Sequence, residues 1–202
     1  MPVNAVVHVV DDDDAIRHSV VFQLETAGYA ARHHASAEAF LGALPHASVG
    51  CVITDVRMPG LNGLEMVRRL NASGFKAPII MMTGHGDIPL AVEAMKAGVV
   101  DFIEKPLDDD ILLRAIESAL SNATTPEQND AQRIERQAKF ASLTAREREV
   151  LAGVIAGKPN KIMAYDLGIS QRTIEAHRAT LMTKSGAANL SELIRKALSL
   201  GY

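Results

Sequence analysis

The sequence predicts a doubly wound α/β domain with five parallel strands, followed by a smaller all-α domain. Over residues 1–121, short apolar runs alternate with amphipathic segments, which is typical of βα repeats that build a parallel sheet between two helical layers. From residue 142 onward the pattern changes to one helix after another. With 202 residues and 48% hydrophobic content, the chain is long enough for two modest domains.

Five apolar runs are predicted as strands, near residues 5–10, 29–34, 50–54, 78–82 and 99–103. The third and fourth runs are almost wholly apolar, so we expect both of these strands to be buried on both faces. Helices fill the intervals. In the third interval Leu64, Val67 and Leu70 fall on one stripe, which predicts an amphipathic covering helix.

Residues 122–141 are predicted as a linker between a domain of residues 1–121 and one of residues 142–202. The segment is rich in Gln, Glu, Asn and Arg and has few large apolar residues. Its part from 127 to 140 lacks Pro and Gly and is compatible with a helix, in which Ile134 and Ala138 are too sparse to form an independent core. Such a helix either lengthens the preceding one or pairs with a second copy.

The last 61 residues predict four helices. Thr144 and Glu147 have the spacing of a capping box, and an apolar stripe follows until Gly157. A short helix over 160–167 stops at Gly168. Ser170 then caps a longer helix over 171–185, and a final helix covers about 189–200. The two helices joined by residues 168–170 predict a helix-turn-helix.

Charge is divided unevenly between the two predicted domains. Residues 142–202 carry nine Lys and Arg against five Asp and Glu, which leaves a net charge of −7 for residues 1–141 out of the total of −3. An acidic front and a basic back indicate different partners. The single cysteine, Cys51, lies inside a predicted strand and is interpreted as a small core residue. Because the sequence shows neither a signal peptide nor a membrane-spanning run, we expect a cytoplasmic protein.

Acidic residues follow two of the predicted strands. Asp55 ends the third apolar run, and an acidic run over residues 11–14 follows the first. The carboxyl ends of parallel strands meet at one edge of the sheet, where open α/β folds place ligands and chemistry. Converging carboxylates of this kind predict a site for a hard cation.

Four more strand-end residues would complete a site for phosphoryl transfer with Asp55: Asp11, Asp12, Thr83 and Lys105. A carboxylate that attacks phosphorus gives an acyl phosphate, and the crowded negative charge needs cations nearby. Taken singly, the acidic run can also be a solvated helix cap, and Thr83 an ordinary strand-end hydroxyl. Their joint placement at one edge of the sheet favours the functional interpretation.

Residues 1–121 resemble the receiver domain of response regulators. The motifs that carry this resemblance cover residues 9–12, 54–63, 82–86 and 102–106. The resemblance implies that Asp55 accepts phosphate from a histidine kinase and that Lys105 contacts the phosphoryl group. It also implies a Mg²⁺ or Mn²⁺ ion bound by Asp11, Asp12, Asp55 and the Arg57 backbone carbonyl. Thr83 and Phe102 would form the switch pair, and the bond between Lys105 and Pro106 is expected to be cis.

Residues 142–202 resemble the four-helix DNA-binding domain of LuxR-type regulators, through motifs over residues 143–151, 157–161 and 173–178. Joined to a receiver, this domain makes the chain similar to FixJ-type response regulators, a branch to which residues 82–98 also point. On this resemblance, Glu175, Ala176 and Arg178 would contact base edges. Phosphate contacts are expected from Lys161, Arg172, Thr173 and Lys184, which position the helix on DNA without reading its sequence.

The predicted function is therefore a phosphorylation-switched transcription factor. Phosphorylation of Asp55 would promote homodimerisation and binding to double-stranded DNA at promoters used by RNA polymerase. The chain is not expected to be an enzyme beyond phosphorylating itself from a phosphodonor and slowly losing the phosphate.

Three other functions were weighed. A phosphohydrolase needs a general acid two residues after its nucleophile, where Arg57 stands. RNA binding would need aromatic stacking residues, which the sequence does not show. A phosphate-independent scaffold with a receiver-like domain remains the alternative.

Overall fold

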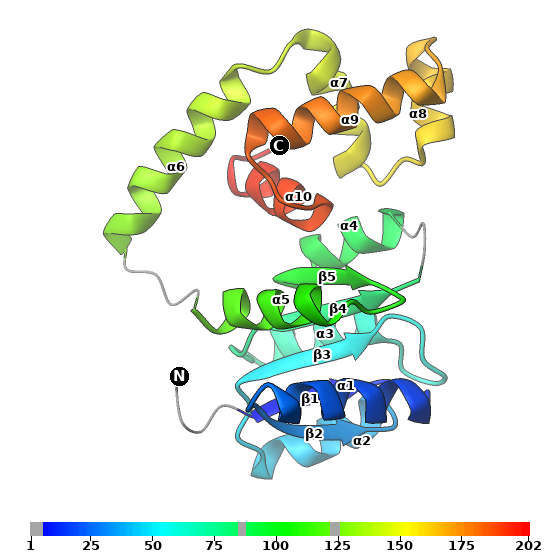
Figure 1. The fold of residues 1–202 in the computed structure, drawn as a ribbon, viewed down its shortest axis with the longest axis vertical. Helices are drawn as coiled ribbons and strands as arrows, with labels where there is room; N and C mark the ends of the chain where they lie inside the picture. The colour runs from blue at the N-terminus through cyan, green and yellow to red at the C-terminus, as the bar shows by residue number, and fades with distance from the viewer. Residues whose placement is uncertain (1–5, 85–87, 122–125) are drawn as a thin grey trace. The chain divides into compact units, whose positions relative to one another are not determined.

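The structure is a computed structural model that describes residues 6–84, 88–121 and 126–202; for residue 88 and residues 126–133 only the backbone is described. The chain divides into two compact units (Figure 1). One comprises residues 1–85 and 97–123, and the other comprises residues 86–96 and 124–202. Each unit is described by itself below.

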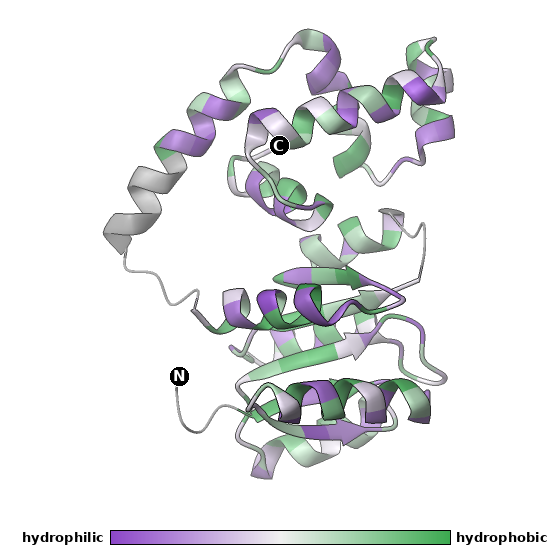
Figure 2. Cartoon of the chain, in the orientation of Figure 1, coloured by the Kyte–Doolittle hydropathy of each residue, from purple (hydrophilic) through white to green (hydrophobic). Residues whose placement is uncertain are grey.

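A five-stranded parallel sheet forms the centre of the first unit. Its strands are β1 (Val6–Val10), β2 (Ala30–His34), β3 (Cys51–Asp55), β4 (Ile79–Thr83) and β5 (Asp101–Glu104), in the spatial order β2-β1-β3-β4-β5. All five predicted strands are confirmed, with bounds that shift by one or two residues. Every residue of β3 and β4 is buried, as the apolar runs predict, and the body of β3 is green, that is, hydrophobic, in Figure 2.

The helices of this unit are α1 (Asp14–Thr26), α2 (Ala37–Ala43), the short 3₁₀ helix η1 (Leu44–His46), α3 (Gly63–Ala72) and α5 (Asp109–Ser121). In α3, Leu64, Val67 and Leu70 are buried, which confirms the predicted covering stripe. Cys51 is fully buried in the core, and burial raises the pKa of its thiol to about 12. The thiol therefore stays protonated at neutral pH and serves as a core group.

The second unit contains α4 (Ile88–Lys96), α6 (Pro126–Ala141), α7 (Ala145–Ile155), α8 (Asn160–Leu167), α9 (Gln171–Ser185) and α10 (Leu190–Ser199). The segment predicted as a linker is thus helical. Its Ile134 is exposed, whereas Phe140 is buried, and its ring lies 5.6 Å from that of Tyr202. The end of α6 therefore packs on the C-terminal helices. No helix in the described ranges is long and apolar enough to span a membrane.

Caps define the helix ends of the second unit as the sequence predicts. Thr144 and Glu147 form both hydrogen bonds of a capping box at the start of α7. Gly168, with φ of 65°, ends α8 in the left-handed conformation, where a glycine avoids the clash that a side chain would meet. The Ser170 hydroxyl then accepts from the Thr173 amide and starts α9. The predicted helix-turn-helix is confirmed.

Candidate functional site

The predicted site residues lie at the carboxyl edge of the sheet because their strands are neighbours in register. Val10 of β1 pairs with Thr54 of β3, so Asp11 and Asp55 follow at the same level. Between β1 and β3 the direction of strand order reverses, and open α/β sheets bind ligands at such a point. Thr83 ends β4 and pairs with Glu104, so Lys105 comes next to it on the following strand.

Lys105 joins the two buried carboxylates. Its Nζ lies 2.7 Å from Oδ1 of Asp55 and 2.8 Å from Oδ2 of Asp11. The Asp11 side chain is 1% exposed and that of Asp55 is 10% exposed, whereas Lys105 is 23% exposed. Its backbone amide also donates to the Thr83 carbonyl at 2.8 Å. The ammonium group therefore balances two carboxylates that have little contact with water.

The electrostatics of this cluster follow from burial and close charges. Burial raises the pKa of Asp55, and the Asp11 charge adds to the rise, against the opposing effects of Lys105 and the Arg57 amide. Burial disfavours the charged form of Lys105, but its hydrogen bonds to the two carboxylates outweigh this and raise its pKa. The site thus combines a lysine whose ionised form is stabilised with an aspartate whose ionised form is disfavoured by burial.

The acidic run divides into four roles. Asp11 contacts Lys105, and its Oδ1 accepts from the Asp13 amide at 2.9 Å. Asp12 is exposed beside it. The Asp13 side chain caps α1 by accepting from two backbone amides, and Asp14 pairs with Arg17. The structure thus places Asp11 and Asp12 beside Asp55, whereas Asp13 has the capping role that the sequence also allows.

Arg17 is a site neighbour that the sequence reasoning missed. It is 5% exposed, and its Nη1 donates to the Asp11 backbone carbonyl at 2.6 Å, while Nη2 pairs with Asp14. Its Nε is buried without a hydrogen-bond partner. The spacing of Asp14 and Arg17, three residues apart at a helix start, is the signal that would have indicated the pair. Arg17 thereby fixes the backbone that presents Asp11.

The loop between β3 and α3 completes the surroundings of Asp55. The Arg57 amide donates to Oδ2 of Asp55 at 2.9 Å, and Asn62 forms a capping box with Glu65 at the start of α3. Gly63 lies against the strand end, because a Cβ there would be 2.0 Å from the Asp55 carbonyl oxygen. Both carboxylate oxygens of Asp55 therefore have a defined partner, and a close glycine contact fixes its backbone.

Three carboxylates at this edge could hold a cation. Oxygens of Asp11, Asp12 and Asp55 lie within 4.8 Å of one another. Carboxylate oxygens are the ligands preferred by Mg²⁺, and one exposed member leaves room for the waters that this ion retains. The residues present therefore fit a hard divalent cation.

The remaining predicted receiver residues also have defined places. Thr83 is 3% exposed at the end of β4. Phe102 is half-buried in β5, and its amide donates to the Asp101 side chain. The expected cis bond between Lys105 and Pro106 is confirmed. Of the receiver motif over residues 82–86, residues 85 and 86 lie outside the described residues.

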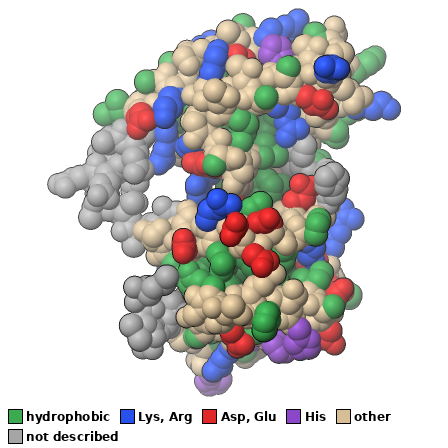
Figure 3. Space-filling model, viewed as in Figure 1, with side chains coloured by type: hydrophobic (Ala, Val, Ile, Leu, Met, Phe, Trp, Pro, Cys, Tyr) green, Lys and Arg blue, Asp and Glu red, His purple; other side chains and the backbone are tan. Residues whose placement is uncertain are grey.

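The second candidate site is α9, the predicted recognition helix. Ile174 and Leu181 are fully buried, so they form the face with which this helix packs on its own domain. Figure 3 shows Lys and Arg side chains spread over the helices of this unit. Four predicted contact residues are exposed: Lys161, Arg172, Glu175 and Ala176. An exposed polar stripe opposite a buried one is what a helix needs in order to enter a DNA groove.

The other three predicted DNA contacts have partners inside the domain. Arg178 donates to Oδ1 of Asn160 on α8 at 2.8 Å. The Lys184 Nζ lies 2.8 Å from Oε2 of Glu147, which is buried at the start of α7. The Thr173 hydroxyl bonds Ser170 at 2.8 Å. The contacts of Arg178 and Lys184 orient α9 against α8 and α7, whereas that of Thr173 belongs to the cap of α9. The charge of Lys184 is already balanced by Glu147.

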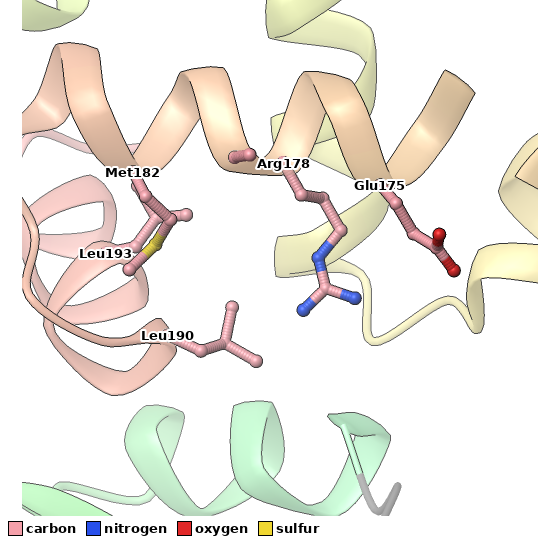
Figure 4. Close-up of a pocket in the computed structure, with 6 residues that line it drawn as sticks. Glu175, Arg178, Met182, Leu190 and Leu193 are labelled. Carbon is pink, nitrogen blue, oxygen red and sulfur yellow. The ribbon is translucent and has the colours of Figure 1, made fainter. Parts of the chain in front are cut away.

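Arg178 and Glu175 also line a pocket between α9 and α10 (Figure 4). The pocket has a volume of about 280 Å³, and its other lining residues include Met182, Leu190 and Leu193. In the close-up, both charged side chains project from α9 to the same side. Burial lowers the pKa of Arg178, against the effect of Glu175, but a guanidinium stays charged at neutral pH.

Comparison with known proteins agrees with this geometry. The family model for the response regulator receiver domain matches residues 7–117, and that for bacterial regulatory proteins of the luxR family matches residues 141–197. The transcriptional regulatory protein FixJ of Azorhizobium caulinodans is 50% identical over 201 residues, which cover 100% of this chain and 95% of that protein. FixJ of Rhizobium meliloti is 47% identical over 196 residues, covering 97% and 96%.

Solved structures give the same result. The crystal structure of full-length FixJ from B. japonicum matches with a TM-score of 0.58 at 50% identity, covering 98% of this chain and 97% of that one. The receiver fragment FixJ-N matches with a TM-score of 0.57 at 47% identity over 60% of this chain and 98% of its own length. The chain therefore belongs to the two-component response regulators of the FixJ type, which join a receiver domain to a LuxR-type DNA-binding domain.

Proposed function

We propose that phosphorylation of Asp55 by a histidine kinase switches this regulator to a homodimer that binds specific sites on double-stranded DNA. The observation that carries the proposal is the Lys105 ammonium between Asp11 and Asp55, at the strand ends that a phosphoryl group can reach. We further propose that residues 1–121 form the receiver and residues 142–202 the DNA-binding domain, with residues 122–141 linking them. The protein would act in the cytoplasm, with RNA polymerase at its promoters.

Asp11, Asp12, Asp55 and the Arg57 carbonyl would hold Mg²⁺, or Mn²⁺ in its place. Support comes from the three carboxylates that converge within 4.8 Å. When bound, such a cation withdraws negative charge from a phosphoryl oxygen. The bond from the Arg57 amide to Asp55 places the Arg57 peptide beside the carboxylate, which favours a role for its carbonyl.

The phosphoryl transfer itself is carried by Asp55. One of its carboxylate oxygens attacks phosphorus, and the bond from phosphorus to the donor's nitrogen or oxygen breaks, with its electron pair leaving on the donor. The Lys105 ammonium would then contact a phosphoryl oxygen in place of the Asp55 carboxylate oxygen. The Thr83 hydroxyl donates to a second phosphoryl oxygen, and Phe102 repacks beside it as the other half of the switch.

On the DNA side, the exposed face of α9 would enter the major groove. Glu175, Ala176 and Arg178 would contact base edges, and Lys161, Arg172, Thr173 and Lys184 would contact phosphates. Because Lys184 is already paired with buried Glu147, we expect its contribution to affinity to be smaller than that of Lys161. Each phosphate contact makes binding more dependent on salt.

The test compares wild type with Asp55→Asn before and after treatment with acetyl phosphate and Mg²⁺. Light scattering measures the oligomeric state, and a titration measures the affinity for duplex DNA. We expect wild type to gain both dimer and affinity, and the variant to gain neither. Equal DNA binding by both proteins, with phosphorylation of wild type confirmed by mass spectrometry, would instead identify a phosphate-independent scaffold.

A further inference from the structure

Glu38 links α2 to the loop that follows Asp55. It is the second residue of α2, and its Oε1 accepts a hydrogen bond from the Leu61 backbone amide at 2.9 Å. We propose that Glu38 is a positioning residue, which holds the loop over residues 56–62 in the conformation that phosphorylation of Asp55 requires. The inference deepens the proposed function and rests on it.

The loop is fastened near both of its ends by backbone hydrogen bonds. The Val56 amide donates to the Met82 carbonyl at 3.1 Å, and the Gly63 amide donates to the Val56 carbonyl at 3.0 Å. Between these points, the Arg57 amide reaches Asp55. The bond from Leu61 to Glu38 ties the far side of the loop to a different helix, so it limits how far Arg57 can move away from Asp55.

Gly60 leaves room in the loop for the Glu38 carboxylate. Gly60 has φ of 73°, a conformation that side chains disfavour, and a Cβ on it would lie 2.9 Å from Oε1 of Glu38. A residue with a side chain at this position would therefore push the carboxylate off Leu61. The missing side chain at Gly60 and the acceptor on Glu38 fit each other, which an incidental surface contact does not require.

The acceptor is charged, and the core of α2 does not depend on it. Hydrogen bonds from its own backbone amide, the Leu61 amide and the Ser36 hydroxyl lower the pKa of Glu38. Bonds to an ionised acceptor are stronger than neutral ones. Glu38 itself is exposed, whereas Ala37 and Phe40 supply the buried face of α2. Removing the carboxylate should therefore loosen the loop without unfolding the helix.

The consequence concerns the cation. If the loop is free to sample other conformations, binding at Asp55 and the Arg57 carbonyl must also order the loop, so a higher concentration of Mg²⁺ is needed. At saturating Mg²⁺ the loop is ordered again and the chemistry is unchanged. Because groups behind metal ligands typically alter metal affinity by 10–100-fold, and Glu38 acts through the backbone, we expect a smaller change of about three- to tenfold.

The experiment uses the full chain as wild type, Glu38→Ala, Glu38→Gln and the control Glu25→Ala, an exposed glutamate on α1. The rate of phosphorylation by acetyl phosphate is measured as a function of Mg²⁺ concentration, and hydrogen exchange of the Leu61 amide is measured by NMR. We expect Glu38→Ala to raise the half-saturating Mg²⁺ concentration by about three- to tenfold and to speed exchange at Leu61, with its maximal rate within about twofold. Glu38→Gln keeps an acceptor oxygen without the charge, so it should be impaired less than Glu38→Ala, and the control should behave like wild type.

Two results would overturn the inference. One is an unchanged Mg²⁺ dependence in Glu38→Ala although Leu61 exchanges faster, because the bond would then exist without positioning the site. The other is a Glu38→Gln variant as impaired as Glu38→Ala, because the charge and not the hydrogen bond would be responsible. Wild type that shows no phosphorylation dependent on Mg²⁺ would refute the proposed function itself, and this inference with it.

Discussion

Replacing Lys105 with Met removes the cation that Asp11 and Asp55 share, while keeping most of the side-chain length. At an effective dielectric constant of about 20, two charges about 2.75 Å apart attract by about 6 kcal/mol before desolvation is counted. Breaking a buried ion pair costs about 3–5 kcal/mol net, and because Lys105 is 23% exposed we expect the lower end, about 3 kcal/mol at pH 7. The folded receiver should be destabilised by this amount.

The loss should depend on pH and on Mg²⁺. Asp55 already has a raised pKa, so its protonation favours the folded state at low pH, and this stability is lost as the pH rises through its folded pKa. Without Lys105 the Asp55 carboxylate protonates more readily still, so the difference from wild type shrinks as the pH falls through the raised pKa of Asp55. Mg²⁺ should bind Lys105→Met more tightly than wild type, because no ammonium competes for the same oxygens, although phosphorylation becomes slower.

Denaturant unfolding of the full chain measures these free energies, and the receiver transition is recognised by its shift on adding Mg²⁺. Lys76→Met makes the same change at an exposed lysine and should alter stability by about 0.5 kcal/mol or less. Unchanged or increased stability of Lys105→Met at pH 7, or weaker Mg²⁺ binding, would refute the view that Lys105 balances two desolvated carboxylates.

Other substitutions test separate features. Gly63→Ala should destabilise the receiver by about 2 kcal/mol or more, because a Cβ would lie 2.0 Å from the backbone carbonyl at the end of β3. Gly42→Ala, with open space in α2, should be neutral or stabilise by up to about 1 kcal/mol. Equal shifts in the thermal unfolding midpoint of the two variants would contradict this contrast. Burial lowers the pKa of His34 to about 4. Because the unfolded imidazole gains a proton first, the free energy of unfolding of wild type should fall by about 1–2 kcal/mol between pH 6.5 and 4, after allowance for partial exposure. A His34→Gln variant with the same pH dependence would show that another group titrates. Asn160→Ala removes the acceptor for Arg178 and should weaken binding to the specific DNA site by about fivefold, while binding to random duplex DNA stays unchanged. An equal loss of affinity for both DNAs would contradict the view that Asn160 orients Arg178.

The sequence predicted the site residues at the strand ends better than the residues that hold them in place. Asp11, Asp55, Thr83 and Lys105 could be placed together because each follows a recognisable apolar run, and neighbouring parallel strands end at one edge. Arg17 could not be found in this way. Its spacing from Asp14 indicates only their ion pair. The contact that supports the site is with the Asp11 backbone carbonyl, a group that every residue carries, so no sequence pattern marks it.

The DNA-binding domain shows the same division. Caps and the buried stripe of α9 are local features, and the spacing of Thr144, Gly168 and Ser170 was enough to locate them. That Lys184 pairs with Glu147, 37 residues earlier, was not predictable, since an ion pair between helices depends on how they pack.

By itself, the sequence determined the order of strands and helices, their caps, and which polar side chains stand at strand ends, because periodicity and capping act within a few residues. Only the tertiary structure decided that Lys105 sits between two carboxylates and that Glu38 holds the loop beside them. These contacts join segments that lie far apart in the chain. Packing of the whole domain sets them, and no local pattern records it.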